Sequence, residues 1–199
     1  MSQPSVSVVI PAYNARSTIE RALQSVANQS LNATEVIVID DASTDDTITI
    51  VSEFSATSKI AIRILRSDQN AGPGSARNRG WNSSTGEFIA FLDADDVWHP
   101  QKLEIQVREM QKNGSFVVSC HERIVSTSHI FPSFDETKVS TRELSLNDFI
   151  IKNRCSTPTV MVRKTVNERY KNEKRNAEDY LLWMEIVTKH GNALLIHSP

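Results

Sequence analysis

The feature that most constrains the fold of this chain is a regular alternation of short apolar runs with segments of helical periodicity. Helical patterns begin near Ser17, near residues 44–46 and after Gly74, and Ser17 and Glu20 have the spacing of a capping box. Strands and helices that alternate at this spacing are typical of βαβ units. The sequence therefore predicts an α/β fold with a Rossmann-like, mostly parallel sheet flanked by helices. The four strand-like runs of the first half lie at 5–10, 35–39, 60–65 and 88–92.

The second half shows the same kinds of element with weaker periodicity. We expect a helix between Pro100 and Gly114, followed by a strand at 116–119. The Ser- and Thr-rich stretch 124–142 predicts an irregular connection. Beyond it we expect, in order, a helix at 146–151, a strand at 159–162, a helix from Glu178 to His190 and a strand at 194–196.

Composition narrows the functional class. A length of 199 residues suffices for one domain with a substantial core, and a net charge of −2 argues against a nucleic-acid-binding protein. We find neither a signal-type segment nor an apolar stretch that could span a bilayer, and expect a soluble protein. Cys120 and Cys155 lack any paired spacing, which favours reduced thiols in the cytoplasm. The densest basic group suggests contact with an anionic substrate or a membrane surface, although such groups are more often solvated: Arg163, Lys164, Arg169, Lys171, Lys174 and Arg175.

Three carboxylates follow the fourth apolar run within four residues: Asp93, Asp95 and Asp96. Open α/β sheets bind ligands at the carboxyl ends of their strands. Carboxylate oxygens suit Mg²⁺ or Mn²⁺, and such ions commonly complete their coordination with substrate phosphates. A metal-bound diphosphate is therefore the first hypothesis, and a turn or helix cap is the alternative.

Polar groups follow the other strand-like runs as well. Tyr13 could lie against a base, and Asp41 could accept a hydrogen bond from a base or a ribose hydroxyl. In the stretch 70–80, Gly72 and Gly74 allow close backbone approach to phosphate at a helix start, and Arg77 could add a positive fork. The alternatives are a turn at 11–14, helix capping at 40–45, and a loop with a helix-packing glycine at 80.

In this arrangement the chain resembles the inverting nucleotide-sugar glycosyltransferases of family 2, which have the GT-A fold. The resemblance covers residues 5 to about 190. It implies a single GT-A domain over 1–199, in which residues up to about 120 bind the nucleotide-sugar and residues 121–199 provide the acceptor site and the catalytic base. Family members commonly continue past this point, so we treat residue 199 as a candidate truncation. Five segments carry the resemblance in order: 8–14, 38–45, 70–80, 91–96 and 176–183.

The resemblance also implies roles for individual residues. Asp95 would be the direct ligand of Mn²⁺ or Mg²⁺, and Asp93 would contact ribose or metal. Asp179 matches the catalytic base, with Glu178 as the second candidate; without the resemblance, a helix-capping role would be preferred for Asp179. The donor, usually a UDP-sugar, would be bound by Pro11, Tyr13, Asn14, Asp41, Gly74, Arg77 and Asp93.

The implied reaction is a single displacement that inverts the anomeric centre. A carboxylate takes the proton of the acceptor hydroxyl, and a metal matches the charge that grows on the departing diphosphate. Bacterial relatives usually extend lipid-linked glycans for capsule, lipopolysaccharide or exopolysaccharide. We therefore expect a cytoplasmic enzyme with peripheral contact to the inner face of the membrane.

Other readings have less support. A phosphoacceptor receiver domain would need an acid pair after the first strand, and a nicotinamide-dependent dehydrogenase would need a Gly-rich turn there, whereas residues 11–14 fit neither. A catalytically silent sugar-nucleotide-binding homologue or assembly partner remains the main alternative. Trp98 is a weak candidate for stacking on a sugar, and His121 and His129 receive no role.

Overall fold

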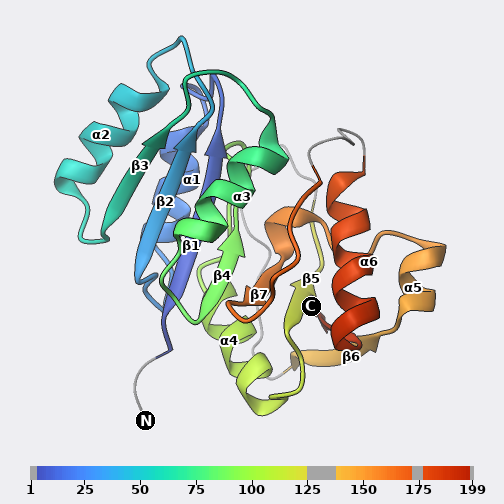
Figure 1. The fold of residues 1–199 in the computed structure, drawn as a ribbon. Helices are drawn as coiled ribbons and strands as arrows, with labels where there is room; N and C mark the ends of the chain where they lie inside the picture. Colours follow the sequence, from blue (N-terminus) through green and yellow to red (C-terminus); the bar gives the residue numbers. More distant parts are fainter. Residues whose placement is uncertain (1–3, 125–137, 172–176, 198–199) are drawn as a thin grey trace.

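The computed structural model describes residues 4–124, 138–171 and 177–197. Its described strands form one eight-stranded sheet in the order β3-β2-β1-β4-β7-β5-β8-β6. Figure 1 shows the sheet extending through the molecule, with helices packed against it. The predicted α/β fold with a mostly parallel sheet flanked by helices is confirmed.

The first half of the chain builds four parallel strands joined by helices. The strands are β1 (Val6–Ala12), β2 (Glu35–Asp40), β3 (Ile62–Arg66) and β4 (Phe88–Phe91). Their pairings β3–β2, β2–β1 and β1–β4 are all parallel, so their carboxyl ends share one edge of the sheet. The connecting helices are α1 (Ile19–Ala27), α2 (Thr47–Thr57) and α3 (Pro73–Ser83).

The second half adds strands of both directions. Its elements are α4 (Lys102–Lys112), β5 (Val118–His121), β6 (Ser140–Leu144), α5 (Leu146–Ile151), the short 3₁₀ helix η2 (Thr157–Thr159), β7 (Met161–Arg163), α6 (Glu178–His190) and β8 (Ala193–His197). Strand β7 is antiparallel to both of its neighbours, β4 and β5. Strand β5 therefore runs parallel to β4, and its carboxyl end lies at the same edge.

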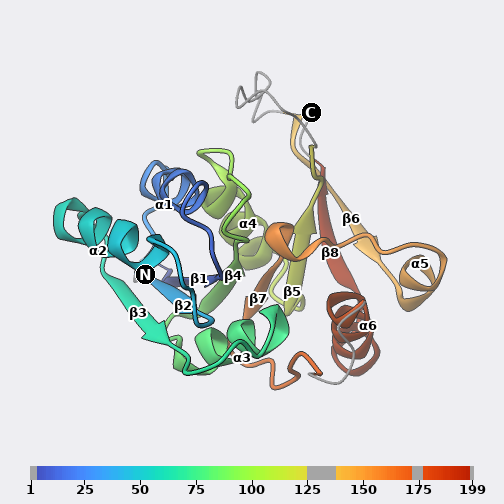
Figure 2. The same cartoon turned by 90° about the horizontal axis from the view of Figure 1, so that it is seen from above.

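Alternation along the strands divides the core between the two faces of the sheet. Val8 of β1 belongs to the cluster that includes Leu23 of α1 and Val107 of α4. Its neighbour Val9 belongs to the other cluster, with Trp183 of α6. Figure 2 shows the same division, with α1 and α4 on one side of the sheet and α3 and α6 on the other. Burial on both faces explains why the central strands are continuously apolar.

The start of α1 differs from the prediction. The helix begins at Ile19, and its N-cap residue, Thr18, makes no side-chain capping bond. The Thr18 hydroxyl instead donates to the carbonyl oxygen of Ala15 at 3.3 Å. The capping box expected from Ser17 and Glu20 is therefore wrong, because the preceding turn carries Ser17 outside the helix. A capping box does occur at α5, between Ser145 and Asp148.

The expectation of reduced thiols is also wrong. Cys120 and Cys155 form a disulfide, and their Cα atoms are 5.5 Å apart. The partners are separated by 35 residues, so no local spacing reveals the pair. The bridge joins the end of β5 to the segment that precedes η2.

The predicted irregular stretch 124–142 is wrong at its end, because residues 140–142 belong to β6. This strand pairs in antiparallel fashion with β8. Residues 125–137 of that stretch, and with them His129, lie outside the described residues, as do Lys174 and Arg175 of the basic group. Among the helices that the structure describes, none has the length and apolar character to cross a membrane.

Candidate active site

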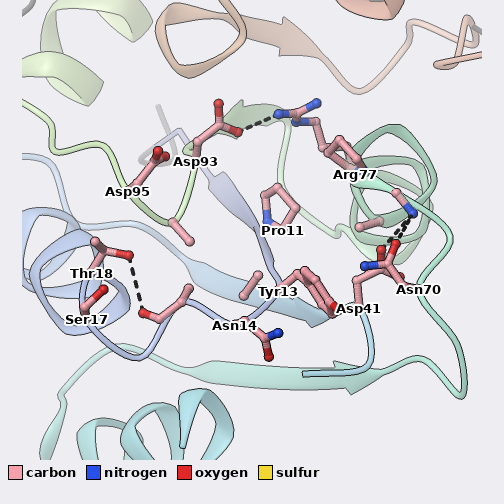
Figure 3. Close-up of a pocket in the computed structure, with 16 residues that line it drawn as sticks. Pro11, Tyr13, Asn14, Ser17, Thr18, Asp41, Asn70, Arg77, Asp93 and Asp95 are labelled. Carbon is pink, nitrogen blue, oxygen red and sulfur yellow. Dashed lines mark hydrogen bonds and ion pairs between the residues drawn. The ribbon is translucent and has the colours of Figure 1, made fainter. Parts of the chain in front are cut away.

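A pocket of about 470 Å³ opens at the carboxyl ends of β1, β2 and β4. This volume lies in the usual range for a small-molecule site. Figure 3 shows Asp93 and Asp95 at one end of the pocket, Tyr13, Asn14 and Asp41 at the other, and Pro11 between them. The predicted donor-site residues that line the pocket are Pro11, Tyr13, Asn14, Asp41, Arg77, Asp93 and Asp95; Gly74 and Asp179 are not part of the lining.

The end of β1 presents an exposed aromatic ring. Tyr13 has 51% of its surface exposed although it lines the pocket. The next residue, Asn14, has a positive φ of 49°. Its conformation is supported by two contacts: its backbone N–H donates to Ser43 Oγ at 3.0 Å, and its side-chain oxygen accepts from Thr44 N at 2.9 Å. The turn thus holds the Tyr13 ring at the pocket wall without covering it.

The carboxylate of Asp41 organises the loop that leads into α3. It is 3% exposed, accepts from the backbone N–H of Ala71 with both oxygens (3.0 and 3.1 Å), and accepts from Gly72 N at 2.8 Å. Gly72 has a φ of +87°, a conformation that glycine adopts at little cost. Of the two oxygens, Oδ1 accepts only the Ala71 bond among the hydrogen bonds of the described residues, which leaves it acceptor capacity toward the pocket.

Two other acids of the 40–45 segment support the local fold. Asp40 accepts from Ser43 N at 3.0 Å and from Arg66 Nε at 3.1 Å. Asp45 accepts from Thr47 N at 3.0 Å, at the start of α2. The alternative of turn formation and helix capping therefore holds for these two acids, whereas Asp41 faces the pocket.

Arg77 links the two acidic parts of the site. Its side chain is 9% exposed, and its Nη2 lies 2.6 Å from Asp93 Oδ1 while its Nη1 lies 3.4 Å from Glu178 Oε1. The guanidinium also lies 5.5 Å from the centre of the Tyr170 ring. The fork expected to face a diphosphate is thus already engaged by carboxylates.

The N-terminus of α3 is also bound by a carboxylate. The Gly74 N–H donates to the carboxylate of Glu178. A Cβ at this glycine would lie 2.8 Å from Glu178 Oε2, so only glycine lets the carboxylate approach so closely. A carboxylate is a favourable group at a helix N-terminus, and here Glu178 occupies the place expected for phosphate.

Of the three acids that follow β4, only two line the pocket. Asp93 and Asp95 line the pocket, whereas Asp96 is outside the lining and pairs with Arg123 at 3.7 Å. Burial raises the pKa of Asp96, and Arg123 opposes this effect. Among the described residues, no group of three or more His, Cys, Asp or Glu side chains could hold a metal. Two carboxylates still fit Mg²⁺, which is usually held by one or two carboxylates with water and substrate phosphates.

The candidate bases lie at the first turn of α6. Asp179 Oδ2 accepts from Thr157 Oγ1 at 3.4 Å, and Oδ1 accepts from Tyr180 N at 2.7 Å. Burial raises the pKa of Glu178; Arg77 opposes this, and the charges of Asp179 and Asp93 add to it. The preceding residue, Ala177, has a φ of 70°, an uncommon conformation for alanine that sets the direction of the helix start. Arg77 lies 2.6 Å from Asp93 and 3.4 Å from Glu178, so the first turn of α6 lies beside the acids that follow β4.

Two further residues near the candidate bases belong to no recognisable sequence motif. Thr157 contacts Asp179, and Tyr170 lies beneath Arg77 with its hydroxyl buried. Burial raises the pKa of Tyr170 well above its ordinary value. No local pattern could have found them, because their partners lie far along the chain.

Trp98 does not face the pocket. It is 3% exposed, and its Nε1 donates to the carbonyl oxygen of Pro158 at 2.8 Å. The sugar-stacking hypothesis is therefore wrong, and the ring packs inside the protein. The described part of the basic group is also engaged: Arg163 pairs with Glu87 at 3.0 Å, and Lys171 pairs with Glu185 at 2.9 Å.

Comparison with curated proteins points to one family. The family described as "Glycosyl transferase family 2" matches residues 7–171. The chain is 34% identical, over 183 residues, to the UDP-Glc:alpha-D-GlcNAc-diphosphoundecaprenol beta-1,3-glucosyltransferase WfgD of Escherichia coli, covering 92% of this chain and 69% of that protein. It is 30% identical over 186 residues to WfaP of the same species, which has the same described activity, covering 92% of this chain and 70% of that protein.

Comparison with solved structures supports the same family. TarS of S. aureus (residues 1–349), in complex with UDP-GlcNAc, matches with a TM-score of 0.80 at 26% identity, over 97% of this chain and 58% of that chain. The present chain thus spans more than two thirds of the two curated relatives and less than two thirds of the solved one. Because the family match covers most of the sequence and the fold agrees, the chain belongs to glycosyl transferase family 2 and has the GT-A fold.

Proposed function

We propose that the protein transfers a sugar from a UDP-sugar to a hydroxyl of a lipid-linked glycan, with inversion at the anomeric carbon, in the synthesis of a bacterial surface polysaccharide. The observation that carries the proposal is the pocket itself. One sheet edge brings an exposed aromatic ring and an acceptor carboxylate to one end, and the carboxylates of Asp93 and Asp95 to the other. This is the order of groups that a base, a ribose and a diphosphate require.

The donor would bind along this edge. Tyr13 would stack on the base, and Asp41 Oδ1 would accept its imide N–H. Asp93 would lie near the ribose or metal, with Arg77 fixing its carboxylate at 2.6 Å. Pro11 and Asn14 would shape the wall, and Gly74 would act indirectly by admitting Glu178. TarS is described with UDP-GlcNAc and the two E. coli relatives with UDP-Glc, which supports uridine as the nucleoside.

Asp95 and Asp93 would hold Mn²⁺ or Mg²⁺. A bound divalent ion would supply positive charge to match the charge that grows on the leaving diphosphate. The remaining steps belong to the chain: the pocket orients the donor, and a carboxylate takes the proton from the acceptor hydroxyl.

We assign the proton acceptor to Asp179 rather than Glu178. Glu178 is paired with Arg77 and with the Gly74 N–H, so its carboxylate is held away from an acceptor. Asp179 contacts only a hydroxyl and its own helix start among the described residues. Attack from the face opposite to the diphosphate inverts the centre. The β-1,3 activity of WfgD and WfaP fits this stereochemistry for an α-linked donor.

The acceptor class follows from the same relatives. Both are described as acting on N-acetylglucosamine linked through a diphosphate to undecaprenol. A lipid-linked acceptor of this kind would bring the protein to the inner face of the cytoplasmic membrane, where we propose peripheral contact.

Conservative variants of the two acids test the proposal. We expect Asp179→Asn to lower the rate of transfer about 10²- to 10⁴-fold, the usual contribution of a general base, while UDP affinity stays within twofold. Glu178→Gln is the matched control and keeps more activity. We further expect Asp95→Ala to remove the Mn²⁺ dependence of UDP binding in calorimetry. Full activity in Asp179→Asn would contradict the base, and metal-dependent binding by Asp95→Ala would contradict the ligand. Metal-dependent UDP binding without any transfer would favour a silent homologue.

A further inference from the structure

Lys102, the first residue of α4, has a buried amino group without an anionic partner among the described residues. It is 5% exposed, and its Nζ is shielded from solvent with no hydrogen-bond partner among the described residues. Its ammonium lies 3.9 Å from the centre of the Trp98 ring. Burial lowers the pKa of Lys102 well below its ordinary value. Buried polar groups are normally hydrogen-bonded, so the unpartnered Nζ is a candidate contact for a ligand.

The next turn of α4 shows which strand Lys102 faces. Gln106 Nε2 donates to Ser119 Oγ of β5 at 3.1 Å and to the carbonyl oxygen of Thr159 at 3.0 Å. Lys102 precedes Gln106 by one helical turn, and His121 follows Ser119 on the same side of β5. The two side chains therefore face each other at the edge where β4 and β5 end.

His121 supplies a second unpartnered polar atom. Its Nδ1 lies 2.6 Å from the carbonyl oxygen of Glu122; because a carbonyl only accepts, Nδ1 carries the proton. Its Nε2 is shielded from solvent and has no partner within the described part of the chain. Burial, with smaller effects from the charges of Lys102 and His99, lowers the pKa of His121 to about 4, although the Glu122 contact opposes the shift.

The Lys102–His121 pair lies on the α4 face of the sheet, and η2 links it to the proposed base, Asp179. The Trp98 ring beneath Lys102 donates to Pro158 of η2 at 2.8 Å. The neighbouring residue of η2, Thr157, donates to Asp179 at 3.4 Å. Lys102 is absent from the lining of the donor pocket. An acceptor whose hydroxyl reaches Asp179 would thus extend over η2 toward Lys102.

We propose that Lys102 and His121 form a subsite for the phosphoryl group of a diphospho-linked acceptor. The proposal rests on the proposed transferase function and specifies how its acceptor is recognised. The flexible four-carbon stem of lysine lets the ammonium leave the Trp98 ring for phosphoryl oxygens at the sheet edge. An anion beside both groups favours their charged forms, so His121 Nε2 becomes a second donor to the phosphoryl group.

The kinetic test compares Lys102→Met with Lys112→Met, which removes the same charge from the exposed end of α4. Each variant is assayed with N-acetylglucosamine diphosphate carrying a short alkyl chain, and with the alkyl glycoside of the same sugar. We expect Lys102→Met to raise KM for the diphosphate acceptor about 10- to 100-fold, the loss of a hydrogen bond to a charged group. For the Lys102→Met variant, the KM for the glycoside, the kcat and the Kd for UDP should stay within twofold of the wild-type values. Lys102→Arg should restore part of the preference for the diphosphate acceptor over the glycoside.

Other outcomes overturn the proposal. An equal loss with both acceptors would show that Lys102 only supports the fold, and weaker UDP binding would assign it to the donor diphosphate. Unchanged kinetics in Lys102→Met would remove the subsite altogether.

A second measurement, an NMR titration, does not require transferase activity. With saturating UDP present, inorganic pyrophosphate should raise the pKa of His121 in NMR titrations of the wild-type protein, but not in Lys102→Met. His121→Gln identifies the signal. If the wild type transfers to neither acceptor, the transferase proposal fails, and this titration still decides the subsite. An unchanged His121 pKa would overturn it.

Discussion

Glu178 and Asp179 are neighbours in the chain, yet their carboxylates have different surroundings. Glu178 has 11% of its side chain exposed and lies 3.4 Å from Arg77. Asp179 accepts from the hydroxyl of Thr157 at the same distance. At the scale of single residues, function here depends on which partner each acid meets: Glu178 is paired with a guanidinium, whereas Asp179 contacts a neutral hydroxyl.

The packing of α3 against the sheet requires a glycine at Gly80. A Cβ there would lie 2.5 Å from both Ile39 Cδ1 and Val9 Cγ1, where α3 crosses the sheet. We expect Gly80→Ala to lower the free energy of unfolding by about 1–3 kcal/mol through overpacking, measured by urea denaturation. Gly114→Ala is the control, since nothing lies within 4 Å of its Cβ position and the stability should not fall. Equal stability of both variants would contradict the packing argument.

Seven of the predicted site residues line the pocket, but their contacts were not predictable from the sequence. Strand ends on one edge are predictable from the alternation of elements, and so Tyr13, Asp41, Asp93 and Asp95 were placed together. The partners of Glu178 and Asp179 were not, because Arg77 is 101 residues away and Thr157 is 22 residues away. The burial of Trp98 likewise depends on Pro158, at a distance of 60 residues.

The buried acid Glu168 contacts the C-terminal end of α6. Glu168 lies 2.9 Å from His190 and 3.2 Å from Lys189, and its side chain is 8% exposed. Burial acts to raise the pKa of Glu168, but the hydrogen bonds from His190 and Lys189 outweigh it and lower the pKa to about 2. At the scale of elements, this contact fixes a helix end that would otherwise be free to fray.

The low pKa of Glu168 predicts a dependence of stability on pH. The unfolded chain binds this proton near the ordinary value of 4.5, whereas the folded chain binds it only near 2. The contribution of Glu168 is therefore fully present above pH 4.5 and is lost as the pH falls toward 2. We expect the free energy of unfolding to decline less steeply across this interval in Glu168→Gln than in the wild type. Identical slopes would contradict the assignment.

The disulfide joins a strand of the sheet to a segment outside the sheet. It connects Cys120 of β5 to Cys155, ahead of η2, across 35 residues. We expect a reductant to lower the free energy of unfolding by about 2–4 kcal/mol, as for other bridges. Thiol labelling of the denatured protein should detect free cysteines only after reduction. Full labelling without reductant would contradict the bridge.

Elements with a clear apolar period were predictable, and β6 was not. Four of its five residues are exposed, and it lies at the edge of the sheet. Such a strand carries no alternating apolar pattern, so only its pairing with β8 defines it. The capping box at Ser17 failed for a related reason, since a local spacing cannot reveal where a preceding turn ends.

For the molecule as a whole, donor binding should appear as added stability. A ligand at 100 times its Kd stabilises the folded state by about 2.7 kcal/mol. We expect UDP or a UDP-sugar with Mn²⁺ to raise Tm, and GDP- or dTDP-sugars to raise it less, in a thermal-shift panel with and without the metal. Asp95→Ala should abolish the difference that Mn²⁺ makes. A panel without any shift would contradict nucleotide-sugar binding.

The antiparallel strand β7 has a consequence for how the chain assembles during its synthesis. Strands β1 to β4 pair with one another within the first half, whereas β7 pairs with β4 and β5 across the centre of the sheet. We expect the half that contains β1 to β4 to become compact while the ribosome is still translating the second half, since long-range pairing is slow and domains form from the N-terminus. Until β7 emerges from the ribosome, the backbone groups along one edge of β4 are unpaired and can pair with strands of other chains. We expect the nascent chain to be most prone to aggregation in that interval.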